Sequence, residues 1–349
     1  MKLDWLVIRS QSISYRLDRR VPTTLACLGA IALVAMVVNV GRGEYPIAPI
    51  DIIKTVLGLD TGNPDHAFVI NVLRLPRTLV AFMVGVAFAI SGTIFQGLTR
   101  NPLADPGIIG INAGASLAAV TAIVLFPTAP VYILPLSAFV GALSIAALIY
   151  ALAWHNGSSP ILLILIGVGL SAIATAVTSL LITFGQIDDV SNALVWLAGS
   201  VYGRTWEQVF SLLPWLIIFV PLALTNSRHL NVLNLGDDLA KGLGSRVEWQ
   251  RGMLVLVGVA LAGAGVATAG TIGFVGLIAP HLGRQLVGTN HQGLILTAAV
   301  LGGIIVVLAD LLGRTLFAPL ELPCGVVTAA VGAPYFLYLL IRQRQKSSL

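Results

Sequence analysis

Charged residues are scarce in this sequence: Asp, Glu, Lys and Arg make up only 10% of the 349 residues, whereas 57% are hydrophobic. A soluble domain carries about 25% charged residues, because its surface must be solvated by water. This scarcity excludes a soluble body of this length and indicates that lipid surrounds most of the chain. We therefore expect an all-α polytopic membrane protein embedded in a lipid bilayer.

Cysteine and histidine are also rare. Cys27 and Cys324 stand alone in apolar stretches and match no metal-binding or redox spacing. The five histidines are scattered, which argues against a membrane-embedded enzyme, and His281 has no second metal ligand spaced nearby. We expect His281 to be a packed, hydrogen-bonded side chain. The sequence predicts no catalytic residue, no cofactor and no metal site.

Two sources of energy for transport are missing from the chain. The interiors of the apolar segments contain almost no ionisable residues, whereas ion-coupled carriers keep such groups at mid-membrane. The phosphate-binding pattern G-x-x-x-x-G-K-[ST] is also absent, so we do not expect this chain to bind ATP. If this chain takes part in transport, the energy must therefore come from a separate ATPase.

Ten apolar segments are candidate membrane spans, because about 20 helical residues cross the hydrocarbon core. The predicted segments are 22–40, 78–98, 107–126, 131–154, 160–184, 206–226, 252–270, 272–287, 293–312 and 323–341. The eighth is short and rich in glycine, and a count of nine or eleven stays open. We predict an N-terminal segment 1–21, one transmembrane domain 22–341 and a C-terminal tail 342–349.

The basic residues predict the orientation of the chain. Placing the N-terminus in the cytoplasm puts most of the 20 Lys and Arg residues on the cytoplasmic side, as membrane proteins prefer. Ten spans then return the C-terminus to the same side. The net charge of +5 is explained by this topology, so no nucleic-acid partner is expected.

The longest cytoplasmic loop, residues 227–251, contains one segment with helix signals. An Asp-rich start at Asp237 and Asp238 is followed by a glycine stop at Gly244. This pattern predicts a short helix on the membrane surface that sits in a groove of a partner subunit. An ordinary connecting loop is the alternative interpretation.

Six segments in a fixed order resemble the iron-chelate and cobalamin permease family of type II ABC importers, the FecCD-type permeases. They span most of the chain, so the resemblance does not rest on any single motif. The segments are 73–77, 91–98 with 100–107, 235–244, 273–281 with Arg284, 309–310 with Arg314, and 321–325 with 332–336.

The resemblance implies a ten-helix subunit with the type II ABC importer permease fold. It implies a dimer of permease subunits with the pathway on the dimer axis, two ATP-binding subunits below and a substrate-binding protein above. The implied substrate is a ferric siderophore, with cobalamin or haem as the alternative. The implied location is the bacterial inner membrane, with both termini cytoplasmic. The particular siderophore, and whether the two permease subunits are identical, stay open.

The resemblance also assigns roles to particular residues. Arginines at the outer side are expected to bind carboxylates of the binding protein, for which the planar guanidinium is suited; the alternative is that they anchor helix ends. The docking candidates are Arg74, Arg77 and Arg314. A cytoplasmic gate is expected in two turns, the first of which could instead be a structural Asn-Pro turn. The gate candidates are Asn101, Leu103, Ser158 and Ser159. The residues expected to couple to the ATPase are Leu235, Gly236, Asp237, Ala240, Leu243 and Gly244.

Overall fold

The computed structural model describes residues 5–10, 13–107, 110–154 and 160–347. Ten helices correspond to the ten predicted spans: α1 (Arg20–Gly41), α4 (Leu75–Thr99), α5 (Ile111–Leu125), α6 (Ile133–Leu152), α7 (Pro160–Phe184), α9 (Trp206–Thr225), α12 (Val247–Ala269), α13 (Val275–Val287), α14 (His291–Thr315) and α15 (Cys324–Ser347). In the described residues, eight of them are long and apolar enough to cross a membrane. The other two, α5 and α13, are shorter, with 15 and 13 residues.

Short elements lie at both ends of the bundle. One end carries α2 (Pro49–Val56), α3 (Asp65–Phe68), the π-helical segment η1 (Val69–Arg74) and α8 (Ile187–Leu197). The other end carries α10 (Ser227–Leu233), α11 (Asp237–Gly242) and a hairpin of β1 (Trp5–Ser10) and β2 (Ile13–Asp18). The strands pair antiparallel, with Trp5 opposite Asp18. The sequence did not predict this hairpin, which forms a two-stranded sheet.

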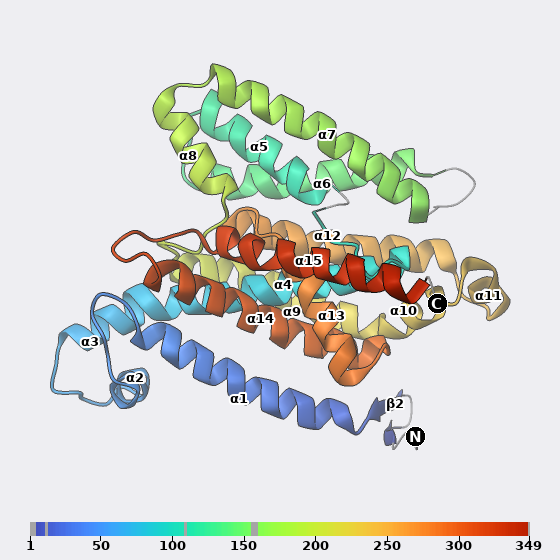
Figure 1. Cartoon of the computed structure of the whole chain (residues 1–349), viewed down its shortest axis with the longest axis horizontal. Helices are drawn as coiled ribbons and strands as arrows, with labels where there is room; N and C mark the ends of the chain where they lie inside the picture. Colours follow the sequence, from blue (N-terminus) through green and yellow to red (C-terminus); the bar gives the residue numbers. More distant parts are fainter. Residues whose placement is uncertain (1–4, 11–12, 108–109, 155–159, 348–349) are drawn as a thin grey trace.

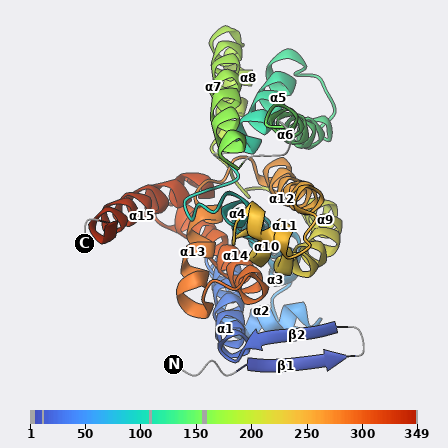
Figure 2. The same cartoon turned by 90° about the vertical axis from the view of Figure 1, so that its right-hand side faces the viewer.

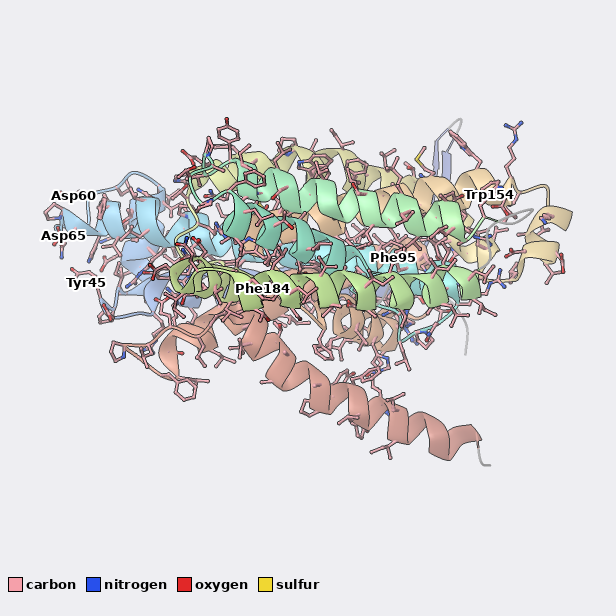
Figure 3. The ribbon with its side chains drawn as sticks, turned by 90° about the horizontal axis from the view of Figure 1, so that it is seen from above. Tyr45, Asp60, Asp65, Phe95, Trp154 and Phe184 are labelled. Atoms are coloured by element: carbon pink, nitrogen blue, oxygen red, sulfur yellow. The ribbon has the colours of Figure 1, made fainter. Side chains whose placement is uncertain are left out.

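The helices are arranged in layers around α4 (Figures 1 and 2). Helices α5 to α8 form one outer layer, α1 lies on the opposite side, and α4 runs through the middle against α9, α12, α13 and α14. Most residues of α4 are buried; Phe95, for example, is 2% exposed. In Figure 3, Tyr45, Asp60 and Asp65 mark one end of the molecule and Trp154 the other. We call these the α3 end and the α11 end.

The outward faces of the bundle are apolar. Phe184 at the end of α7 is 84% exposed, and large aliphatic side chains are exposed along α1, α7 and α15. Such faces are poorly solvated by water, and in a membrane they are covered by lipid or by another apolar helix. The exposed faces therefore agree with a multi-pass membrane protein.

Glycines allow α4 to lie directly against its neighbours. A Cβ atom on Gly85 would collide with the backbone oxygen of Gly302 in α14, and one on Gly92 would collide with the backbone oxygen of Gly276 in α13. Lipid provides no hydrophobic drive for helix association, so close packing of small residues has to supply it. The two glycine contacts therefore fix how near α4 approaches α13 and α14.

Substitution of Gly85 by alanine should destabilise the protein by about 1–3 kcal/mol, because the new methyl group pushes α4 away from α14. The measurement is thermal unfolding of the detergent-solubilised protein. Gly29→Ala in α1 is the matched control, because a Cβ atom there has no neighbour within 4 Å. Equal melting temperatures for the two variants would contradict the proposed backbone contact.

Candidate functional site

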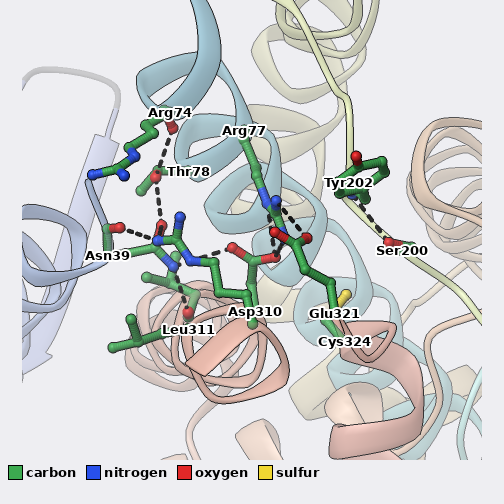
Figure 4. A network of polar contacts seen from close by, with 12 residues as sticks. Asn39, Arg74, Arg77, Thr78, Ser200, Tyr202, Asp310, Leu311, Glu321 and Cys324 are labelled. Carbon is green, nitrogen blue, oxygen red and sulfur yellow. Dashed lines mark hydrogen bonds and ion pairs between the residues drawn. The ribbon is translucent and has the colours of Figure 1, made fainter. Parts of the chain in front are cut away.

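Polar side chains form a buried cluster near the α3 end, where α1, α4 and α14 meet (Figure 4). Arg77, in the first turn of α4, donates from Nη2 and Nε to Asp310 Oδ1 at 2.8 and 3.0 Å. Its Nη1 donates to Glu321 Oε2 at 2.9 Å. Arg77 and Asp310 are 9% and 3% exposed, so this ion pair is shielded from water and ties α14 to α4.

Asn39 at the end of α1 completes what we call the Arg77–Asp310 cluster. Its Oδ1 accepts hydrogen bonds from Thr78 at 2.7 Å and from Arg314 at 2.9 Å. Its Nδ2 donates to the backbone oxygen of Val307 at 2.9 Å and to Asp310 at 3.2 Å. Asn39 is completely buried, and these bonds satisfy both its donors and its acceptor, as burial requires. One amide thus holds three helices together.

The structure brings the three predicted docking arginines to this one end of the bundle, and it gives each an internal partner. Arg77 and Arg314 are buried within the cluster. Arg74 is half-buried and donates to the backbone oxygens of Val40 at 2.9 Å and Tyr45 at 2.7 Å. Their docking role stays a prediction, and the internal bonds agree with the alternative interpretation as anchors of helix ends.

Four members of the cluster were not predicted to belong to it, and one of them is Thr78. Asn39, Asp310 and Glu321 supply the acceptors for the arginines. Asp310 and Glu321 did carry a signal in the sequence, since each is an acidic residue at the end of an apolar segment. Asn39 carried none.

Asp310→Asn should destabilise the protein by about 3–5 kcal/mol, because it removes the buried carboxylate from the Arg77 guanidinium and leaves only the partly exposed Glu321 as a counter-charge. Glu321→Gln is the matched control: it removes the other carboxylate on Arg77, but the Glu321 side chain is 35% exposed and we expect a loss of about 0–1 kcal/mol. Thermal unfolding in detergent measures both. A larger loss for Glu321→Gln would contradict the assignment of Asp310 as the buried partner.

A second polar cluster lies at the α11 end. Helix α4 ends at Thr99, and Arg100 follows in the left-handed conformation with φ of 51°. Asn101 then closes a turn, because its Oδ1 accepts from the backbone N–H of Leu103 at 3.0 Å and its carbonyl accepts from Ala104 at 3.1 Å. Asn101 and Leu103 are half-buried. These two gate candidates therefore belong to one hydrogen-bonded turn, whereas Ser158 and Ser159 lie outside the described residues.

The short helix predicted in the long loop is observed as α11, which begins at Asp237 and ends at Gly242. Gly236 precedes it with φ of 112°, and Gly244 follows it with φ of 81°, conformations that favour glycine. Ala240 is buried against the bundle. Three leucines spaced four residues apart are exposed by more than half: Leu235, Leu239 and Leu243. The segment therefore exposes a set of apolar side chains.

Asp237 connects α11 to two other segments, and we call this contact the Asp237 junction. Both carboxylate oxygens accept from Arg251 Nη2 at 2.8 Å, and Oδ1 also pairs with Arg100 Nη2. Partial burial by itself would raise the pKa of Asp237, but hydrogen bonding to Arg251 and the charges of Arg251 and Arg100 lower it below its ordinary value. Asp237 is therefore ionised at neutral pH.

Among the described residues, no three His, Cys, Asp or Glu side chains come together as a metal site. His281 hydrogen-bonds Gln285 at 2.9 Å and packs edge-on against Tyr335 with ring centroids 5.8 Å apart. It is a packed histidine, as the sequence predicted.

Apolar outer faces and charges gathered in two clusters, one near each end of the bundle, define a polytopic membrane protein. Comparison with known proteins narrows this class. Residues 31–342 match the model of the FecCD transport family. The Fe(3+)-citrate import system permease protein YfmE of Bacillus subtilis is 42% identical over 332 residues, covering 95% of this chain and 98% of the relative. The achromobactin transport system permease protein CbrC of Dickeya dadantii is 44% identical over 316 residues, covering 90% of each.

The fold comparison agrees. A solved transporter, assigned to the metal-chelate type of ABC transporter and in an inward-facing conformation, matches with a TM-score of 0.83 and 32% identity, covering 92% of this chain and 99% of that chain. This chain therefore belongs to the FecCD transport family, which confirms the resemblance seen in the six sequence segments.

Proposed function

We propose that this chain is the permease subunit of an ATP-driven importer that carries ferric chelates across the bacterial inner membrane. The family match over residues 31–342 carries the proposal. The names of two relatives, a ferric citrate and an achromobactin transport permease, support an iron chelate as the substrate. Large, rigid chelates need a wide passage that binds them weakly, and the mostly uncharged helices of this chain suit such a passage.

Energy is proposed to enter at the α11 end. Of the two separate ATPase subunits, one would bind the exposed Leu235, Leu239 and Leu243 of this chain, and the other would bind the second permease subunit. In this orientation the α11 end and both termini face the cytoplasm, in agreement with the distribution of basic residues. The turn of Asn101 and Leu103 is then placed to act as the cytoplasmic gate, where it would meet the same turn of a second permease subunit.

The α3 end is proposed to receive the substrate-binding protein. Arg74 is the most accessible of the three docking candidates there. Arg77 could take part by exchanging Glu321, whose side chain is 35% exposed, for a carboxylate of the binding protein. Arg314, bonded to Asn39, would then hold the docking surface in place while contributing positive charge.

Arg74→Glu should weaken binding of the cognate substrate-binding protein at least tenfold, because it replaces a cation by an anion where we expect a carboxylate partner. Affinity is measured by surface plasmon resonance on the transporter in lipid nanodiscs, using protein that elutes as a single species. Arg42→Glu, an exposed arginine at the same end, is the matched control for net charge. An equal loss in both variants would indicate long-range electrostatics instead of docking at Arg74.

Uptake of radiolabelled iron tests the function itself. Iron presented as ferric citrate, a catecholate siderophore and a hydroxamate siderophore is given to the source strain, a strain lacking the gene and the complemented strain. We expect uptake from one chelate to be lost and then restored. Loss of cobalamin or haem uptake with normal iron uptake would instead assign the alternative substrate, and unchanged uptake of all of them would contradict an importer role.

A further inference from the structure

The Asp237 junction joins the end of α4, the start of α11 and the start of α12. We propose that Asp237 is a positioning residue that transmits displacement of α11 to the turn at residues 100–104 through Arg100. The proposal rests on the function given above, because it assumes that an ATPase moves α11 and that this turn is a gate.

The backbone at Arg100 is the first observation. A residue that ends a helix in the left-handed conformation is usually glycine, since side chains disfavour positive φ. Among the described residues, only Arg100 and Phe274 have positive φ without being glycine. An arginine at this position is therefore unfavourable for the backbone, which points to a role for its side chain.

The contacts of the Arg100 side chain show what that role is. Nε donates to the carbonyl of Leu233, the last residue of α10, at 3.0 Å. Nη2 pairs with Asp237, the first residue of α11. The guanidinium thus spans the short connection that leads into α11. Asn101 follows Arg100 directly and closes the turn at residues 100–104, so a shift of α11 pulls on the backbone from which the turn begins.

The two arginines at Asp237 differ in exposure. The Arg251 side chain is 1% exposed and lies within α12, whereas the Arg100 side chain is 36% exposed. A desolvated ion pair with two hydrogen bonds is held more firmly than a solvated one. Asp237 therefore has one buried partner on α12 and one partly exposed partner on the turn. Movement of α11 and the start of α12 as a unit would reach the turn through Arg100.

Two substitutions cut this link in different ways. Asp237→Asn removes the shared charge. Arg100→Gly removes the side chain, with its bonds to Leu233 and Asp237, while keeping a residue that accepts φ of 51°, so the backbone of the turn should be preserved. Asp238→Asn is the matched control, because it neutralises the adjacent carboxylate, which is exposed and takes part in no ion pair among the described residues.

The assembled transporter, with its own ATPase and binding protein, is reconstituted in liposomes and given radiolabelled ferric citrate, or the chelate identified by the uptake experiment. We expect the iron imported per ATP hydrolysed to fall at least tenfold in Asp237→Asn and Arg100→Gly, and to match the wild type in Asp238→Asn. A wild-type ratio in either of the first two variants would overturn the proposal while leaving the proposed function intact.

Hydrogen exchange gives a readout that does not depend on the chelate. In the assembled wild-type complex, we expect ATP binding to change the exchange of the amides at residues 100–104, including the hydrogen-bonded N–H of Leu103. The change should disappear in Asp237→Asn and Arg100→Gly and persist in Asp238→Asn. If the wild-type complex imports no iron, the proposed function fails, and this exchange pattern still decides whether Asp237 transmits movement. An ATP-dependent change that persists in Arg100→Gly would refute the link.

Discussion

The backbone contact of α4 with α13 and α14 is the constraint on which the rest of the structure depends. Hydrophobic burial cannot drive helix association in lipid, so the helices have to approach closely enough for dispersion forces to act along their length. Gly85 and Gly92 permit this on α4, opposite Gly302 and Gly276. With α4 held in this way, its side chains are buried on nearly all sides, and its two ends have fixed positions relative to the neighbouring helices.

Both polar clusters form at the ends of that fixed helix. Its 25 residues span about 38 Å at about 1.5 Å per residue, which exceeds the hydrocarbon core. Arg77 in the first turn and Arg100 just past the last turn can therefore both carry charge, while the apolar stretch between them lies in lipid-like surroundings. Because α4 is held in place, both clusters are attached to the same fixed helix. Each cluster also binds segments that pack elsewhere on the bundle.

The sequence predicted the helices well and the side-chain partners poorly, for a physical reason. A membrane span is a continuous hydrophobic segment, which the sequence shows directly. The predicted span 160–184 therefore matches α7, Pro160–Phe184. Arg77 and Asp310, in contrast, are 233 residues apart, and their contact depends on how α14 packs against α4. The sequence placed both at helix ends without showing that they pair. The β1–β2 hairpin was missed because a polar, basic segment before the first span reads as a topological signal.

The two clusters differ in how much water reaches them. This difference makes one cluster more suited to stay rigid and the other more suited to move. Asp310 is 3% exposed and shares its oxygens with groups on α1 and α4, so movement there would leave buried charges unpaired, at a cost of several kcal/mol. The side chains of Asp237 and Arg100 are 30% and 36% exposed, so water can replace the contact between them at a much smaller cost. The end of the bundle around Arg77 is therefore suited to remain rigid, and movement is easiest at the end that carries α11. The proposed function requires this asymmetry, because a surface that receives a binding protein has to persist while a gate at the opposite end changes.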